Sequence, residues 1–167
     1  SSSNDGGSGS AETAAAPTDG VLTVGLLGDI GQPPDPDIYY ANNGLAIVLN
    51  AYEGLVQYKN DSDAVEIAPR LATSWEASPD NTTFTFHLRD DVTFSDGTPL
   101  TAQVVKDNFD DVVATGAKAT WVISYFATYD SSAVVDDHTV TVTFKSPNAS
   151  FPQAVATSGM GIVGEAT

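Results

Sequence analysis

The sequence of 167 residues contains no cysteine and very few basic residues. Without cysteine, the chain can form neither a disulfide bond nor a cysteine-ligated metal site. Only 6 lysine and arginine residues stand against 22 aspartate and glutamate residues, which gives a formal net charge of −16. This balance argues against nucleic acid or anionic lipid as a partner, because phosphate groups are bound by basic surfaces. It does not identify a cationic ligand, since a solvated acidic surface is the simpler explanation.

The sequence also lacks an apolar run of about 18 residues, the length that a membrane-spanning helix requires. Hydrophobic residues make up 41% of the chain and aromatic residues 9%, so most of the chain should fold around a core. The length suits one ordinary domain or a piece of a larger protein. Residues 159–167, GMGIVGEAT, are apolar at the end of the chain and indicate a strand whose partner lies further on, so we expect a truncated protein.

Patterns for catalysis or metal binding are missing as well. His87 is predicted on the polar face of a strand and His138 at a turn, and neither has a second ligand at metal-binding spacing. The paired acids are adjacent in sequence and would point to opposite faces of a strand, which makes them poor acid–base pairs; they are Asp90–Asp91, Asp110–Asp111 and Asp136–Asp137. Neither a GxSxG motif nor a dinucleotide-binding glycine pattern occurs. We therefore expect no enzyme, no metal and no cofactor.

The first part of the chain changes character at residue 21. Residues 1–20 are small and polar and should form a disordered tether, because they cannot bury enough apolar surface to order themselves. The run VLTVGLL at residues 21–27 suits a buried strand, and the prolines of residues 31–37 cannot continue it. Apolar residues then recur at helical spacing, which predicts a helix that ends at Gly54 before a strand at 55–58; they are Leu45, Val48, Leu49 and Tyr52.

Two antiparallel hairpins are predicted in the rest of the chain. The first joins a strand at residues 71–76 to the alternating run TFTFHL at 83–88, through the turn SPDN. The second joins residues 133–135 to the alternating run TVTVTF at 139–144, through Asp136 and Asp137. Because alternate residues share one face of a strand, each run should bury one side only.

A helix is predicted between the two hairpins. Thr101 can cap its first amide groups, and Gly116 ends it. Its apolar stripe comprises Val105, Phe109, Val112 and Val113. Hairpins combined with helices in this order indicate an α+β fold, and we expect Trp75 and Phe86 in its core.

Aromatic residues are the best candidates for a binding surface. Tyr40 follows the proline-rich break, and Trp121, Tyr125 and Phe126 follow the predicted helix. Rigid amphipathic rings suit a binding wall, because they cover apolar surface and still offer polar atoms. Core packing is the preferred role for Phe126, whereas for Trp121 and Tyr40 both roles stay open.

One stretch carries a family resemblance. Residues 68–105, APRLATSWEASPDNTTFTFHLRDDVTFSDGTPLTAQVV, closely resemble the signature region of the family 5 solute-binding proteins, the extracytoplasmic receptors of ABC importers for oligopeptides, dipeptides, nickel and some sugars. The matching positions are Pro69, Leu71–Ala72, Ser74–Trp75, Thr85–Phe86, Leu88–Arg89 and the run from Phe94 to Ala102. One departure is Val104, which stands where the family usually has an acidic residue that completes a capping box, so Thr101 should cap alone.

The resemblance implies a periplasmic-binding-protein-like fold, the type II flytrap, of which this chain is a fragment. Family members run to roughly three times this length. Residues 21–52 would then be the first strand and helix of domain I, residues 53–158 the small domain II, and residues 159–167 the return toward domain I.

The resemblance also implies the site and the setting. Tyr40, Ala41 and Asn42 would line the ligand crevice, Trp121 would close over the ligand from domain II, and Tyr125 would be its neighbour. The solute would be a peptide, the partners ABC permease subunits, and the alternatives a nickel- or sugar-binding member, or a sensor or adhesin on the same scaffold. Residues 1–20 resemble the tether of a Gram-positive lipoprotein from which the lipid-modified cysteine, and any signal segment, has been removed.

Overall fold

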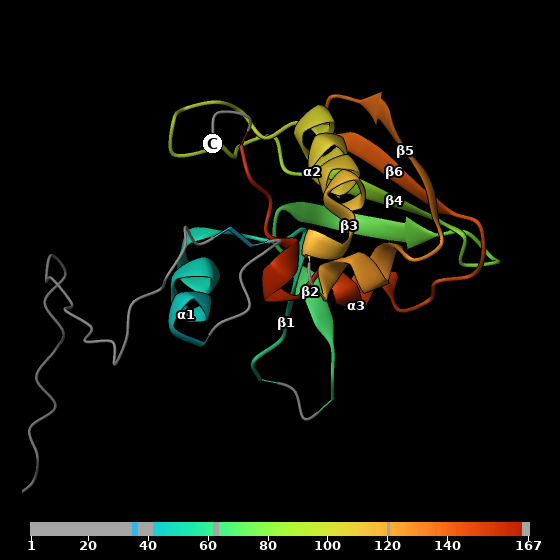
Figure 1. The fold of residues 1–167 in the computed structure, drawn as a ribbon. Helices are drawn as coiled ribbons and strands as arrows, with labels where there is room; N and C mark the ends of the chain where they lie inside the picture. The colour runs from blue at the N-terminus through green and yellow to red at the C-terminus, as the bar shows by residue number, and fades with distance from the viewer. Residues whose placement is uncertain (1–34, 37–41, 62–63, 120, 165–167) are drawn as a thin grey trace, which may run out of the picture.

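The computed structural model describes residues 35–36, 42–61, 64–119 and 121–164. A four-stranded antiparallel sheet forms the body of the molecule, and helix α2 (Ala102–Thr115) crosses one of its faces (Figure 1). Helix α1 (Asn42–Ala51) and a two-stranded ribbon lie beside this body. No helix within the described ranges is long and apolar enough to cross a membrane.

The large sheet consists of β3 (Ala72–Ala77), β4 (Thr83–Leu88), β5 (Tyr129–Asp136) and β6 (Thr139–Phe144). Their spatial order is β3-β4-β6-β5, with every neighbouring pair antiparallel. Both predicted hairpins are therefore confirmed, and β5 begins earlier than the sequence predicted. Strand β6 lies beside β4, so the connection through α2 carries the chain over the sheet to its far edge.

Alternation along β4 and β6 gives the sheet one buried face. In β6, for example, Val140 and Val142 are 0% exposed, while the intervening Thr141 is only half-buried. The same pattern in β4 buries Phe84 and Phe86 and leaves Thr85 half-buried. Period-two patterning in the sequence thus determines which side of the sheet meets the core.

The turn between β3 and β4 is built by its own polar side chains. The Oδ1 atom of Asp80 accepts hydrogen bonds from Ser78 Oγ at 2.7 Å and from Thr82 Oγ1 at 2.9 Å. These bonds hold the pKa of the Asp80 carboxyl below its usual value. Asn81 has a φ of 54°, the left-handed conformation that asparagine tolerates best after glycine. The predicted SPDN turn is confirmed.

Helix α2 begins and ends where the sequence predicted. The Thr101 hydroxyl accepts a hydrogen bond from Val104 N at 3.3 Å, and Gly116 ends the helix with a φ of 58°. Phe109 and Val112 face the core, but Val113 is 37% exposed. The prediction for Val113 was wrong because one residue further along a helix is a rotation of about 100°, which carries the side chain off the buried face.

Helix α1 differs in part from its prediction. Val48 is 1% exposed, whereas Leu49 is 54% exposed, so the apolar face is narrower than the sequence pattern indicated. The helix ends at Ala51 rather than at Gly54. Gly54 instead permits a close approach of two chain segments, since a Cβ atom there would lie 2.7 Å from the carbonyl oxygen of Val155.

A second, two-stranded sheet follows α1. It pairs β1 (Val56–Tyr58) with β2 (Ile67–Pro69) in antiparallel register. The strand predicted at residues 55–58 is confirmed as β1. Its partner was not predicted, because three residues are too few to show a period.

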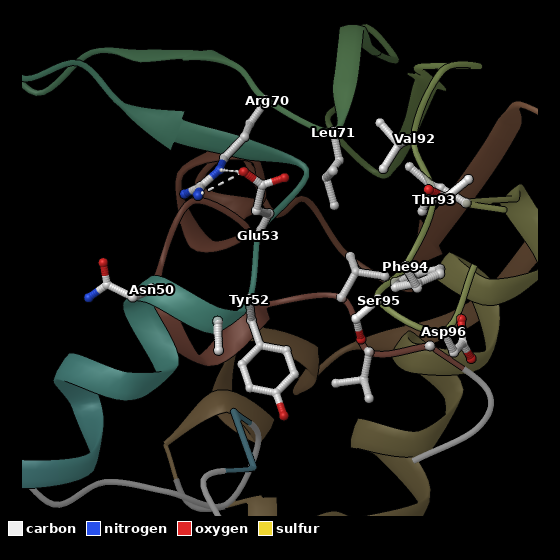
Figure 2. A pocket seen from close by; sticks show the side chains of 15 residues that line it. Asn50, Tyr52, Glu53, Arg70, Leu71, Val92, Thr93, Phe94, Ser95 and Asp96 are labelled. Carbon is white, nitrogen blue, oxygen red and sulfur yellow. Dashed lines mark hydrogen bonds and ion pairs between the residues drawn. The ribbon is translucent and has the colours of Figure 1, made fainter. Parts of the chain in front are cut away.

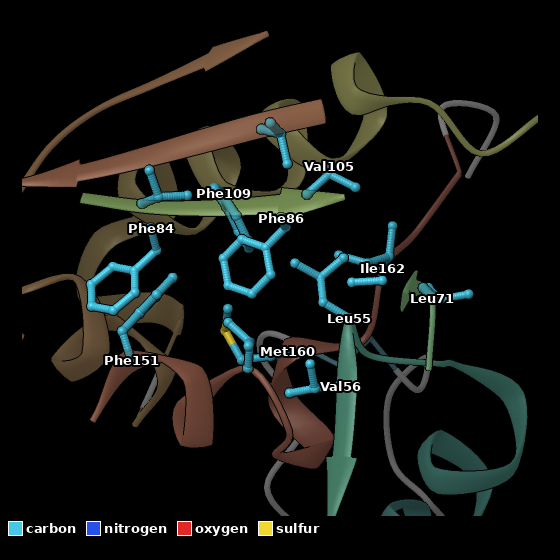
Figure 3. Packing of buried hydrophobic residues seen from close by; sticks show 14 of the residues in the cluster. Leu55, Val56, Leu71, Phe84, Phe86, Val105, Phe109, Phe151, Met160 and Ile162 are labelled. Carbon is cyan, nitrogen blue, oxygen red and sulfur yellow. The ribbon is translucent and has the colours of Figure 1, made fainter. Parts of the chain in front are cut away.

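Phe151 lies at the centre of an aromatic core. It opens the short helix α3 (Phe151–Ala154), and its ring centroid is 4.8 Å from that of Phe144 and 5.6 Å from that of Phe126. Phe84, Phe86 and Phe109 surround the same point (Figure 3). The predicted core positions of Phe86 and Phe126 are confirmed. Trp75 packs against this core but is only half-buried, because β3 is an edge strand.

The last described residues are held by individual hydrogen bonds to other elements, and the strand predicted at residues 159–167, whose partner was expected further on, stays a prediction. Residues Ser158–Met160 form a single 3-10 turn, η3, and residues 161–164 belong to no helix or strand. Ile162 N donates to Glu53 O at 2.9 Å, and Val163 N donates to Asn108 Oδ1 at 2.8 Å. The two bonds go to different elements, so no ladder forms. The predicted tether and the strand at residues 21–27 lie outside the described residues.

Candidate functional site

Three of the five predicted site residues fall within the described ranges. Asn42 begins α1, and only its backbone is described. Tyr125 lies in the 3-10 helix η2 (Val122–Phe126), and Trp121 is the residue immediately before this helix. Tyr40 and Ala41 lie outside the described residues.

Trp121 and Tyr125 form one aromatic unit. Their ring centroids are 5.6 Å apart and their planes meet at 85°, an edge-to-face arrangement that favours the pair beyond simple burial. Both side chains are half-buried. Burial raises the pKa of the Tyr125 hydroxyl above its usual value, and the neutral hydroxyl can donate a hydrogen bond.

The Trp121 ring rests on Gly159. A Cβ atom at position 159 would lie 2.8 Å from Trp121 Cζ2 and 2.6 Å from Val122 Cγ2, closer than real carbon contacts allow. Only glycine therefore lets η3 lie under the indole. Since η3 also contacts α1, the ring, its support and the helix that Asn42 begins lie in one contiguous region.

A separate cavity of about 500 Å³ lies where four chain segments meet (Figure 2). Its walls come from the end of α1 and the residues after it (50–53), from 70–71, from the loop at 92–96 with Leu100, and from 162–164. No sequence signal could have located it, because these segments are far apart in the chain and carry ordinary residues.

The cavity's charged groups are already paired. Arg70 Nε and Nη2 each lie 3.1 Å from Glu53 Oε1, as the dashed lines in Figure 2 show. The Asp96 carboxylate accepts hydrogen bonds from Thr98 N and Oγ1, which lower its pKa. The described lining contains no histidine, so Ser95 has no imidazole base there. The cavity can hold a polar group, but its lining offers no nucleophile–base pair.

A polar cluster links α2 to β5. The Tyr129 hydroxyl donates to Asp110 Oδ1 at 2.5 Å and also contacts Ser132 Oγ at 2.8 Å, while Lys106 pairs with the same Asp110. Burial first, and the Asp110 carboxylate second, raise the pKa of Tyr129 to about 12. Each member is paired within the cluster, which indicates a structural role. Among the described residues, no group of three or more acidic or histidine side chains could hold a metal ion.

Comparison with known proteins places this fold in a family. Residues 66–166, more than half of the chain, match the family model described as "Bacterial extracellular solute-binding proteins, family 5 Middle". The "Probable D,D-dipeptide-binding periplasmic protein DdpA" of Escherichia coli is 36% identical over 155 residues, which is 92% of this chain and 29% of that protein. The "Nickel-binding periplasmic protein" of the same organism is 38% identical over 109 residues, 65% of this chain and 20% of that protein.

Solved structures agree with the sequence comparison. NikA from Brucella suis, solved with Fe(III)-EDTA, superposes with a TM-score of 0.71 at 31% identity and covers 81% of this chain and 26% of NikA. The murein tripeptide binding protein MppA of Escherichia coli gives a TM-score of 0.68 at 26% identity, over 80% of this chain and 28% of MppA. The chain thus spans less than a third of these relatives and has the α+β fold of a part of a periplasmic binding protein. It belongs to the bacterial extracellular solute-binding proteins of family 5.

Proposed function

We propose that the complete protein is the solute-binding receptor of an ABC importer. It captures an oligopeptide by closure of two lobes and delivers it to permease subunits in the membrane, without catalysis. Family membership supports the receptor role. The peptide is supported by two relatives, the D,D-dipeptide-binding protein and DppA of Helicobacter pylori, which was solved with the peptide STSA.

The solute contacts one wall formed by Tyr40, Ala41, Asn42, Trp121 and Tyr125. The observation that carries this placement is the seating of Trp121, whose half-buried ring is fixed between Gly159 and Tyr125. An aromatic surface that is already immobile loses little conformational entropy when a ligand binds. Helix α1, which Asn42 begins, contacts η3, the turn that carries Gly159.

Other solutes and roles have support of their own. A relative named for nickel binding favours a metal complex, and stacking on Trp121 would suit a sugar. A sensor or adhesin on the same scaffold would share every residue described. Uptake of labelled peptide by cells with and without the gene separates an importer receptor from those two roles, because only an importer receptor is needed for uptake.

The receptor works outside the cytoplasmic membrane in this proposal. The periplasmic location in the names of the relatives supports that setting. In a lipid-anchored protein on a Gram-positive cell surface, residues 1–20 would be the tether. Their small, polar composition is the support for this role. Mass spectrometry of the protein extracted from its native membrane tests the anchor, since a diacylated N-terminus adds a defined mass.

Calorimetric titration of the complete receptor tests the solute class. We expect saturable binding of di-, tri- or tetrapeptides, with weaker binding of nickel complexes and monosaccharides. Trp121→Ala should weaken peptide binding, whereas Trp75→Phe, at a half-buried tryptophan on β3, should leave it unchanged. Saturable binding of nickel or sugar with no peptide binding would overturn the proposed solute. Equal peptide affinity in the Trp121→Ala variant would overturn the proposed wall.

A further inference from the structure

Two crossings of the chain meet beside the cavity. The outgoing crossing, residues 52–54, leads from α1 to β1, and the return crossing, residues 161–164, follows η3. They are joined by the hydrogen bond from Ile162 N to Glu53 O, at 2.9 Å. They also touch side by side, since a Cβ atom at Gly161 would lie 2.7 Å from Tyr52 Cβ.

Asn108 of α2 holds the return crossing from the other side. Its Nδ2 donates to Val163 O at 2.8 Å, and its Oδ1 accepts from Val163 N at 2.8 Å. One side-chain amide thus pairs with both polar groups of a single backbone residue, as a neighbouring strand would. The two residues are 55 positions apart in the sequence.

The orientation of the Asn108 amide is fixed by a third bond. Nδ2 also donates to Val104 O, one helical turn earlier, at 2.9 Å. Both Nδ2 hydrogens are therefore used, and Oδ1 is used as well. A flipped amide would place a donor against Val163 N and an acceptor against Val163 O, so only one orientation satisfies the site.

Apolar side chains also contact the return crossing, on both sides of Val163. Ile162 is 4% exposed, and Gly164 lies against the Phe94 ring, where a Cβ atom would be 3.1 Å from Cγ. Helix α2 itself is anchored on the large sheet by Phe109 and Val112. Helix α2, which is held on the sheet, therefore binds the return crossing through the side chain of Asn108.

We propose that Asn108 is a positioning residue that locks the return crossing to helix α2, so that the two crossings form one rigid junction. This lock, the pair of hydrogen bonds between Asn108 and Val163, also affects the proposed solute wall. The reason is that η3 directly precedes the return crossing and carries Gly159 beneath Trp121. Each hydrogen bond of Asn108 joins two residues of this chain, so the proposal requires no particular solute.

Nuclear magnetic resonance on the wild-type chain tests the lock directly. We expect a scalar coupling through the hydrogen bond between Val163 N and the Asn108 side-chain carbonyl carbon. Backbone order parameters of residues 161–164 should match those of α2, at about 0.85. Order parameters below about 0.6 for the crossing, in a chain whose α2 is rigid, would overturn the proposal whatever any variant does.

Asn108→Ala should release the crossing selectively. Amide exchange at Val163 should accelerate by about tenfold or more relative to the buried amides of β4 and β6, which report global unfolding. The indole N–H resonance of Trp121 should shift in the absence of any solute. Asn108→Asp keeps the acceptor for Val163 N but sets a carboxylate against Val163 O, so it should fail to restore protection.

Asn50→Ala is the matched control. Asn50 is also a helical asparagine, and its Nδ2 bonds the Ala46 carbonyl one turn earlier, at 2.7 Å. Asn50→Ala removes only this local side-chain bond within a helix. The amide exchange of Val163 should therefore stay at the wild-type rate. Equal acceleration in both variants, or none in Asn108→Ala, would contradict the lock.

Discussion

The indole of Trp121 lies so close to the backbone of Gly159 that position 159 has no space for a Cβ atom: the nearest indole carbon would be 2.8 Å away. Trp121, just before η2, and Gly159, in η3, thereby hold each other in place. This contact supports the proposed solute wall.

Gly159→Ala should displace the Trp121 ring and lower stability by about 1–3 kcal/mol, the usual cost of overpacking. Chemical denaturation followed by tryptophan fluorescence measures both effects. Gly164→Ala is the graded control, since its new Cβ would be 3.1 Å from the Phe94 ring, a milder contact. A Gly159→Ala variant as stable as Gly164→Ala, or more stable, would contradict the packing described.

Phe151→Ala should be among the most destabilising single changes in the chain. The ring is 0% exposed and contacts five other phenylalanine rings, so its loss should cost about 3–5 kcal/mol. Thermal unfolding measures the loss. Val135→Ala, at a side chain 61% exposed, should change stability by no more than about 0.5 kcal/mol. Comparable effects of the two changes would contradict the position of the core.

Tyr129 should titrate late at high pH. Its pKa in the folded chain is about 12, raised from 10.0 by burial and by Asp110. A raised pKa in the folded state means that the neutral hydroxyl contributes stability below pH 10, and that this contribution is lost as the pH rises toward 12. Ultraviolet absorbance of tyrosinate, in wild type and Tyr129→Phe, assigns the step. Unchanged absorbance near pH 12 after the substitution would show that Tyr129 titrates elsewhere.

Stability should increase with salt concentration. Acidic residues outnumber basic ones by 22 to 6, so repulsion prevails over attraction across the surface. Four ion pairs occur in the described part of the chain, and surface pairs are worth about 1 kcal/mol or less each. Raising NaCl from 0.01 M to 1 M shortens the screening length from about 30 Å to about 3 Å and should raise the melting temperature.

Asp90→Asn combined with Asp130→Asn is the control for that prediction. Both carboxylates are exposed, and their removal lowers the net negative charge at little cost to packing. The variant should depend less on salt than the wild type does. A melting temperature that falls as NaCl rises would show that the ion pairs prevail, which contradicts the charge argument.

Sequence patterns located the regular elements well, because their physical signals are local. The Thr101 cap, the Gly116 end of α2 and the Ser78–Asn81 turn depend on a few neighbouring residues. Leu49 and Val113 were misassigned because apolar spacing alone does not give the width of a buried face. Tertiary contacts decide that width.

The candidate site was much less predictable. Family resemblance made Trp121 a candidate, which stays a prediction, and nothing in the sequence indicated that Gly159 would support its ring, since the contact joins residues far apart in the chain. The same holds for Asn108 and Val163. It holds too for residues 161–164, which side-chain bonds and a single backbone bond fix to distant elements, contacts that their apolar sequence did not indicate.

Peptide affinity of the complete receptor, compared between wild type and Trp121→Ala, tests the central claim most directly. Isothermal titration with the tightest-binding peptide of a length series should give a dissociation constant at least about tenfold weaker in the variant, equivalent to about 1.4 kcal/mol. Circular dichroism should show that the variant remains folded at the titration temperature, so that the loss reflects contact with the solute. An unchanged dissociation constant in a folded variant would contradict a peptide-binding wall at Trp121.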